Sequence, residues 1–242
     1  MLHDYFKKVT DLLKQVENQE EIVIRKAGKK IAQAIENEKI IHLFGCGHSH
    51  ILMEEFFYRA GGLVPVRPIF HEPLMLHEGG QRSSQLEKQP NYAKQFMIDQ
   101  PIEPGDVCIV LSTSGLNPVP IDVAQISKDK GAFVIGLTSI PYSTSQSPRH
   151  QSGKRLMDVV DLVINNKAPI GDAILMHEEV TVPFSSSSTL IGVAILHAVF
   201  AEAIKMMGDK GIEAPVFVSG NIEGSATHNQ KLVEKYQNRI NF

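Results

Sequence analysis

Apolar and polar positions follow a helical spacing at the start of the chain. Within residues 1–37, apolar side chains recur three or four positions apart while Lys and Glu fill the remaining faces, which is typical of amphipathic helices. Two such patterns meet near Asn18 and Gln19, so the segment is predicted to form a helical hairpin. The second apolar face of this hairpin either covers a sheet or meets a partner subunit, and the pattern leaves both open.

From Ile40 onward, short apolar runs that end in Gly or Ser alternate with helical patterns. Strands are predicted at 40–44, 64–70, 107–111, 133–137 and 162–164, with a last short strand at 215–218. Helices are predicted at 51–60, 119–130, 190–207 and 223–238. This alternation indicates βαβ units and a mostly parallel, doubly wound sheet. No internal repeat or domain boundary is visible, so residues 38–242 are predicted to complete a single α/β domain spanning 1–242.

Two polar stretches interrupt this alternation. Residues 71–100 contain His-Glu pairs and a Gly-Gly, and residues 139–153 are rich in Ser and Pro. Both are long for connections within a compact domain, and long loops are often mobile or functional. The two stretches are therefore candidates for a role at a binding site.

Composition excludes several classes of protein. The net charge of -3 and the 21% of charged residues argue against a main role in binding nucleic acid or an anionic membrane. The two cysteines, Cys46 and Cys108, lie in or beside apolar runs, so no disulfide framework is expected and a reducing, cytoplasmic location is predicted. No signal peptide and no apolar run long enough to span a bilayer are evident.

The loop after the first strand has the sequence GCGHSH, from Gly45 to His50. Glycine lets the backbone approach a ligand, and the N-terminus of the following helix offers free N–H groups and partial positive charge. The spacing is not the dinucleotide fingerprint, because the third Gly is missing. Gly47, His48 and Ser49 are candidate anion-binding residues, although a tight turn with Ser49 as a helix cap would look the same.

Two further loops carry more hydroxyl groups than capping requires. The first, before a helix that opens at Pro118, and the second, before the helix at 190–207, contain the following candidates: Ser112, Thr113, Ser114, Gly115, Asn117, Ser187, Ser188 and Thr189. A helix cap needs one such side chain. Several together are typical of a site that holds an anion with neutral donors, although a polar linker remains an alternative for residues 185–189.

The GCGHS and STSGLNP motifs, each between a strand and a helix, resemble those of the SIS (sugar isomerase) phosphosugar-binding family. The resemblance covers roughly residues 20 to 210. Within the family, the chain is similar to phosphoheptose isomerases and N-acetylmuramic acid 6-phosphate etherases. It implies a three-layer α-β-α sandwich with a five-stranded, mostly parallel sheet, a dimer or tetramer with sites near subunit boundaries, and phosphate binding by the second loop. Asn117 stands where the family more often has Thr.

The catalytic carboxylate of these two enzyme groups lies on the helix after the first loop, and the matching position here is Arg59. Guanidinium stays protonated and cannot act as a base, so Arg59 is assigned to phosphate or carboxylate binding. By resemblance to the isomerase domain of glucosamine-6-phosphate synthase, Glu72 is the predicted base. His197, on a stretch resembling that of phosphoheptose isomerase, is the predicted acid–base partner. Glu72 could equally be a solvated loop acid and His197 a core histidine.

Metal ligands are spaced closely enough to be considered. Cys46, His48 and His50, with His71 or His77, form a candidate zinc set. In a phosphate loop these side chains have a simpler use as hydrogen-bond donors. The site is therefore predicted to contain neither a metal nor another cofactor.

The function predicted from these residues is binding of a phosphorylated sugar, with aldose–ketose isomerisation as the reaction. Non-catalytic sensing of a sugar phosphate is the main alternative, followed by an amino-sugar phosphate lyase or etherase. Nucleotide binding is disfavoured because Phe70, not an acid, ends the second strand. The apolar surface of residues 1–37 further predicts a homo-oligomer.

Overall fold

The computed structural model describes residues 1–242 and contains a five-stranded sheet in which every pair of neighbours is parallel. The strand order is β2-β1-β3-β4-β5. The chain adds β2 on one side of β1 and the later strands on the other side, so the strand order reverses between β1 and β3. The strands are β1 (Ile41–Gly45), β2 (Val66–Pro68), β3 (Val107–Leu111), β4 (Phe133–Thr138) and β5 (Leu162–Asn165). The predicted sheet is thereby confirmed.

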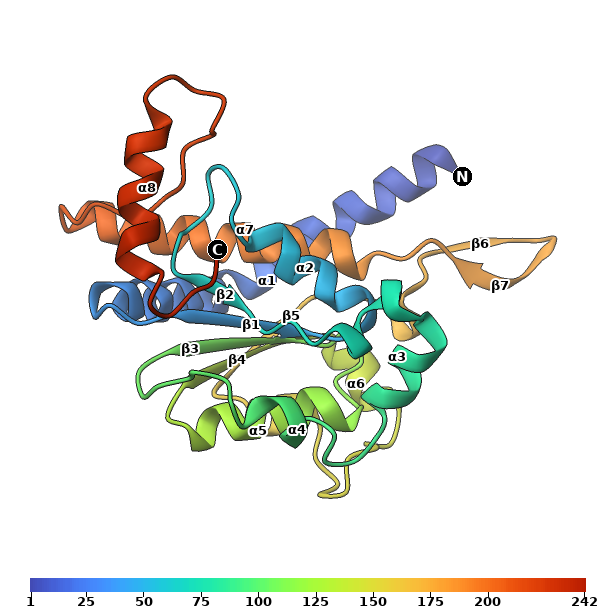
Figure 1. Cartoon of the computed structure of the whole chain (residues 1–242). Helices are drawn as coiled ribbons and strands as arrows, with labels where there is room; N and C mark the ends of the chain where they lie inside the picture. The colour runs from blue at the N-terminus through green and yellow to red at the C-terminus, as the bar shows by residue number, and fades with distance from the viewer.

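Helices cover both faces of this sheet (Figure 1). One layer holds α1 (Leu2–Glu36), α2 (His50–Phe56) and α7 (Ser188–Asp209); the other holds α3 (Gly80–Glu87), α4 (Lys94–Met97), α5 (Pro118–Asp129) and α6 (Ile140–Ser145). The helix α8 (Ser225–Tyr236) lies at the periphery near the C-terminus. Short 3-10 helices occur at Gly47–Ser49, Glu72–Leu74, Leu76–Glu78, Leu156–Asp158 and Ile170–Asp172.

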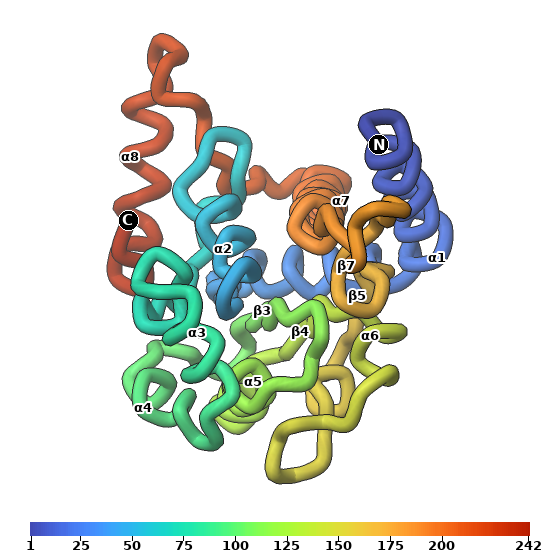
Figure 2. Tube along the Cα trace, turned by 90° about the vertical axis from the view of Figure 1, so that its right-hand side faces the viewer, coloured from blue at the N-terminus to red at the C-terminus, as the bar shows by residue number.

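The two layers follow from the alternation of side chains along each strand. In β3 every residue is buried, with Ile109 in the apolar cluster shared with α1 and α7, and Val110 in the cluster shared with α5. A parallel strand covered on both faces reads as a continuous apolar run for this reason. Figure 2 shows α7 end-on, beside α1 and on the same side of the sheet.

The predicted N-terminal hairpin is wrong, because α1 is one uninterrupted helix of 35 residues. Its buried face continues through the expected turn from Val16 to Glu20 and Ile24, at helical spacing. Glu20 interrupts the apolar pattern in the sequence, but its carboxylate is paired with Lys167 at 2.6 Å and accepts a hydrogen bond from the backbone N–H of Asn165 at 3.2 Å. In the sequence, a charged residue on the buried face of one helix is therefore easily mistaken for a break between two helices.

Other predicted boundaries also change. The helix expected at 51–60 ends at Phe56, because Tyr58 adopts a positive φ of 47°. The stretch 71–100 is not a loop, because it forms α3 and α4. The helix α4 brings Phe96 and Met97 into the apolar cluster shared with α5. Residues 215–218 form no strand beyond a single bridge between Leu63 and Val216.

An antiparallel hairpin that the sequence did not indicate precedes α7. Its strands β6 (Leu175–His177) and β7 (Val180–Phe184) project from the body as an arm (Figure 1). Met176 and Val182 on this arm are 69% and 62% exposed. An isolated two-stranded hairpin is only marginally stable in water.

The helix α7 is, by length and composition, apolar enough to cross a membrane, contrary to the expectation that no such run exists. It lies instead against α1 and α2, with Ile195, Leu196 and Val199 fully buried. Core helices of soluble proteins share this apolar composition, so the pattern is weak evidence for a membrane span.

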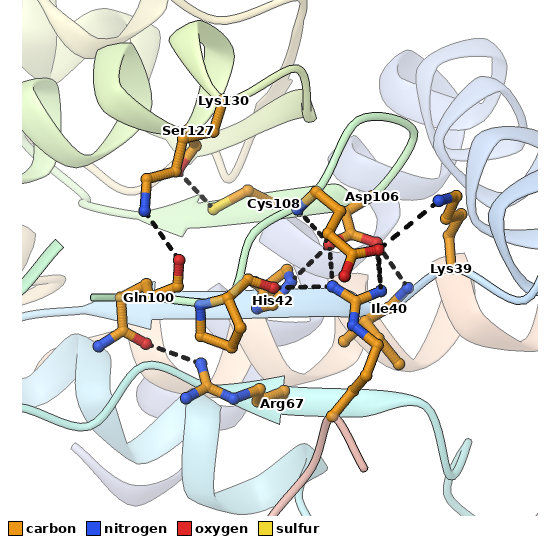
Figure 3. Close-up of polar contacts among 12 residues, drawn as sticks. Lys39, Ile40, His42, Arg67, Gln100, Asp106, Cys108, Ser127 and Lys130 are labelled. Carbon is orange, nitrogen blue, oxygen red and sulfur yellow. Dashed lines mark hydrogen bonds and ion pairs between the residues drawn. The ribbon is translucent and has the colours of Figure 1, made fainter. Parts of the chain in front are cut away.

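A buried polar network lies at the amino ends of β1 and β3, where Asp106 precedes β3 and His42 belongs to β1 (Figure 3). The carboxylate of Asp106 accepts hydrogen bonds from His42 Nε2 at 3.0 Å, from Arg239 at 2.7 and 3.1 Å, and from the backbone N–H groups of Ile40 and Glu103. Asp106 and His42 are fully buried. The network ties the chain end to the starts of β1 and β3.

Candidate functional site

The carboxyl ends of β1 and β3 lie side by side, because Gly45 pairs with Leu111 in the sheet register. The loop after β1 and the loop after β3 therefore start as neighbours, at the point where the strand order reverses. Open parallel sheets bind ligands at this position. A cavity of about 380 Å³ opens between the two loops, α3, and the start of α7.

Most of the predicted binding residues line this cavity. They are Gly47, His48, Ser49, Ser112, Thr113, Ser114, Asn117 and Ser188. A larger hollow of about 650 Å³ lies between the end of α1 and α8, lined by none of these residues and by side chains of both charges. The hydroxyl-rich cavity is therefore the better candidate site, although it is the smaller one.

The loop after β3 is shaped so that its donors face outward. Gly115 has a φ of +62°, and a Cβ atom there would lie 2.7 Å from Thr138 Oγ1, so only glycine fits. Its N–H donates to Ser112 Oγ at 3.3 Å. The backbone N–H groups of Thr113 and Ser114 donate to no acceptor in the chain. Gly115 thus acts on the site by folding the loop and does not line the cavity itself.

The start of α7 is stabilised by a carboxylate that reaches it from outside the helix. Asp172 accepts hydrogen bonds from the backbone N–H groups of Ser187 and Ser188 at 3.1 and 2.9 Å, and from both hydroxyls. Negative charge is favoured at a helix N-terminus. Ser187 is consequently buried behind Ser188, while Thr189 faces a small hollow beside Asn166.

Besides Gly115, Ser187 and Thr189, three more predicted residues lie outside the cavity lining: Arg59, His197 and Glu72. Arg59 follows the end of α2 and is ion-paired with Glu55. His197, on α7, places its Nε2 atom 3.3 Å from Oε1 of the same Glu55 and packs against the Phe56 ring at 4.6 Å between centroids. Burial and the neighbouring Arg59 lower the pKa of His197. A carboxylate–imidazole pair therefore exists on α2 and α7, but its carboxylate is Glu55.

Glu72 begins a 3-10 helix after β2 and is exposed. Its side chain makes no hydrogen bond or ion pair, and the partial burial expected of a base is not present. Its assignment as the base stays a prediction. Glu178 and Glu179 lie exposed at the tip of the β6–β7 arm.

Sequence reasoning missed several cavity residues that come from the two polar stretches. Ser83, Ser84 and Glu87 belong to α3, and Tyr142 belongs to α6. The unusual length of both stretches was the available signal, and it marked the correct segments without identifying residues. Asp172 had no signal in the sequence.

The candidate metal ligands are engaged in other contacts. The Nδ1 atom of His50 is hydrogen-bonded to the carbonyl of Gly47, and Nε2 of His71 lies 2.9 Å from the Tyr92 hydroxyl. Burial raises the pKa of the Cys46 thiol well above its ordinary value, which disfavours the thiolate that binds zinc. No group of three potential ligands is clustered in the chain. A metal-free site stays a prediction.

Comparison with known proteins shows which family this chain belongs to. The family model of the SIS domain matches residues 4–139, more than half of the chain. This chain belongs to the SIS domain family. A UPF0309 protein of Halalkalibacterium halodurans is 58% identical to this SIS protein over 240 residues, covering 99% of this chain and 96% of the relative. A UPF0309 protein of Geobacillus kaustophilus is 58% identical with the same coverage.

Solved structures with a similar fold include two phosphoheptose isomerases. The enzyme of Neisseria gonorrhoeae superposes with a TM-score of 0.59 at 16% identity, covering 84% of this SIS protein and 97% of that chain. The enzyme of Francisella tularensis superposes with a TM-score of 0.55 at 17% identity, covering 84% and 96%. At such identity these likenesses show the fold alone.

Proposed function

We propose that this protein binds a phosphorylated sugar in the cavity between the loops after β1 and β3, and interconverts its aldose and ketose forms. The observation that carries the proposal is the cradle of neutral donors at the reversal of strand order. Its hydroxyls come from Ser49, the Ser112–Ser114 loop and Ser188. Membership of the SIS family and the likeness to phosphoheptose isomerases support the same ligand class.

The phosphate group is assigned to the loop after β3. The free N–H groups of Thr113 and Ser114 and their hydroxyls converge on the cavity without a Lys or Arg side chain among the lining residues. Backbone N–H groups in a tight loop form anion-binding concavities in many phosphate sites. Phosphate recognition here relies on hydrogen bonds rather than on ion pairs.

We expect Ser114→Ala to weaken binding of fructose 6-phosphate by about 1–3 kcal/mol, because one charge-assisted hydrogen bond is lost in a partly desolvated site. Isothermal titration calorimetry measures the change. Ser186→Ala is the matched control, since Ser186 is exposed and does not line the cavity. Equal affinity of the Ser114 variant and the parent protein would show that this loop does not hold the phosphate.

Isomerisation moves a proton between neighbouring carbons and needs a positioned base and acid. The Glu55–His197 pair supplies both types of group within hydrogen-bonding distance on adjacent helices. The exposed fractions of 33% for Glu55 and 50% for His197 leave the pair accessible from solvent. Glu72 remains the alternative base, and matched variants of the two residues separate them.

We also propose that the protein is a homo-oligomer in which a second copy covers α1 and the β6–β7 arm. Phe6 and Ile22 on α1 are 63% and 70% exposed, and β7 is exposed over most of its length. Large apolar side chains that stay exposed in the folded chain are candidates for burial at an interface. The arm gains stability from such a partner because a lone hairpin is marginal.

Light scattering at micromolar concentration should give a mass at least twice 26.8 kDa. The double variant Phe6→Glu, Ile22→Glu should shift the protein toward monomer, because burying two carboxylates at an interface is costly. Deleting α1 is a poorer test, since Ala27 and Ile31 are fully buried in the core. A monodisperse monomer of the intact chain would contradict the proposal.

A further inference from the structure

The cavity contains a carboxylate that the sequence did not single out. Glu87 is the last residue of α3 and lines the cavity together with the Ser112–Asn117 loop. It forms no ion pair, and its side chain is only partly exposed. A charged carboxylate repels an anion bound in the same cavity. Its presence there is unfavourable unless the carboxylate is neutralised, for example by taking up a proton.

The two carboxylates of the cavity differ in how they are stabilised. Asp172 accepts hydrogen bonds from two backbone N–H groups at the start of α7, so its negative charge is supported. Glu87 has no such support. Beside it lies the amide of Asn117, whose Oδ1 atom accepts a hydrogen bond from Arg149 Nη1 at 2.9 Å, which leaves the amide nitrogen for Glu87.

The surroundings of Glu87 make its charged form less stable than that of an exposed glutamate. Burial raises the pKa of Glu87, and the Asn117 amide, Lys88 and Arg149 offset only part of this effect. The other titratable groups around the cavity are Cys46 and His48 on the first loop, Tyr142 on α6 and Asp172 before the arm. No Lys or Arg side chain lines the cavity to neutralise added negative charge.

Entry of a phosphate dianion places two further negative charges in the same cavity. Charges of like sign at close range in a partly desolvated site strongly favour protonation of the group that titrates most easily. Asp172 Oδ1 accepts hydrogen bonds from two backbone N–H groups at the start of α7, whereas Glu87 has no backbone donor, so the proton goes to Glu87. A protonated carboxyl group has one O–H donor, which can then bond to an oxygen of the ligand.

We propose that Glu87 takes up one proton from solvent when the phosphate ester binds, and that it holds the ligand as a hydrogen-bond donor. This inference rests on the proposed binding of a phosphorylated sugar in this cavity. It makes affinity dependent on pH, with tighter binding on the acidic side. Glu87 thereby selects ligands that present an acceptor oxygen next to the phosphate-binding loop.

Sulfate is the sharpest probe, because it keeps its double negative charge at all the pH values used and any pH dependence comes from the protein. Calorimetric titration between about pH 5.5 and 8.5 should show Kd rising with pH. The slope should approach about tenfold per pH unit where Glu87 is charged in the free protein and neutral in the complex, since one proton is then taken up on binding. In Glu87→Gln the amide is always neutral and can donate. The Kd of this variant should vary little with pH and be lower than that of the parent protein at the alkaline end.

The variant His48→Gln is the matched control, because His48 lines the same cavity and histidine is the residue type that most often titrates near neutral pH. It should keep the pH dependence of the parent. A slope that is absent from the parent, that survives in Glu87→Gln, or that disappears in His48→Gln instead would overturn the inference.

Fructose 6-phosphate provides a second measurement on the unaltered protein. Titration at one alkaline pH in two buffers of different ionisation enthalpy should give uptake of close to one proton per ligand bound, and Glu87→Gln should abolish it. Binding without such uptake would refute the role of Glu87 and leave the proposed function standing. If neither sulfate nor fructose 6-phosphate bound the parent protein, the proposed function would fall together with this inference.

Discussion

Replacing Glu55 by Gln is expected to reduce sugar-phosphate isomerisation by at least about a hundredfold while leaving phosphosugar affinity nearly unchanged. The lower bound is what a single positioned general base contributes. Glutamine keeps the shape of the side chain and removes its basicity. Glu55 is the carboxylate that lies 3.3 Å from His197, and it is outside the lining of the phosphate cavity, so catalysis and anchoring are separable.

Two matched variants make this expectation decisive. Glu54→Gln alters the neighbouring carboxylate of α2, which faces His50 at 3.4 Å rather than His197, and should leave turnover within about threefold of the parent, because its surface contact contributes little. Glu72→Gln tests the base indicated by the sequence. A hundredfold loss in Glu72→Gln with normal turnover in Glu55→Gln would reverse the assignment.

The pKa shift of His197 has the direction expected of an imidazole that accepts a proton in an acid–base pair. Burial and the positive charge of Arg59 lower the pKa of His197, so near neutral pH its ring can accept a proton. Arg59 is ion-paired with Glu55, the proposed base. Phosphosugar binding without turnover in the parent would instead indicate a sensing module.

The architecture was predictable from the sequence because each parallel strand is buried on both faces and reads as an apolar run. Val107–Leu111 is the clearest case, since side chains of both faces pack into apolar clusters. The prediction failed where a buried charge interrupted a helix. Glu20 and its partner Lys167 are 147 positions apart, so no local pattern could show that the charge is compensated. The same limit explains why α1 was divided into two helices.

The site was predictable in its loops and unpredictable in its carboxylates. The polar loops after β1 and β3 are recognisable from their local composition, and the pairing of β1 with β3 places the two loops side by side. The sequence predicts a helix that includes Arg59, but α2 ends at Phe56 and Arg59 lies beyond it. Matching positions along the sequence therefore did not indicate Glu55 as the carboxylate of this helix. Glu87 and Asp172 enter the cavity from segments whose folding depends on tertiary contacts.

Replacing Asp106 by Ala is expected to lower the free energy of unfolding by about 3–5 kcal/mol, the cost of removing one partner from a buried ionic network. The change removes the acceptor for His42, for Arg239 and for two backbone N–H groups at the amino ends of the sheet. Urea denaturation at constant m-value measures the loss. Asp209→Ala, which breaks an exposed pair with Lys205, is the control and should change stability by less than about 1 kcal/mol.

The same network should make stability decrease as the solution is acidified. Burial lowers the pKa of His42, so below about pH 6.5, the ordinary value for histidine, the unfolded chain binds a proton that the folded chain does not. Burial alone would raise the pKa of Asp106, but hydrogen bonds from His42, Arg239 and two backbone N–H groups lower it well below its ordinary range. Its contribution is therefore present above about pH 4 and is lost as the pH falls further.

Variants separate these two parts of the acid profile. His42→Gln should flatten the dependence between about pH 6.5 and 4.5, because the titrating group of that range is removed. Asp106→Asn should flatten the part below about pH 4 while lowering stability at neutral pH, where the carboxylate is the better acceptor. An acid profile identical to that of the parent in both variants would show that the stability of the fold at low pH is governed by other carboxylates.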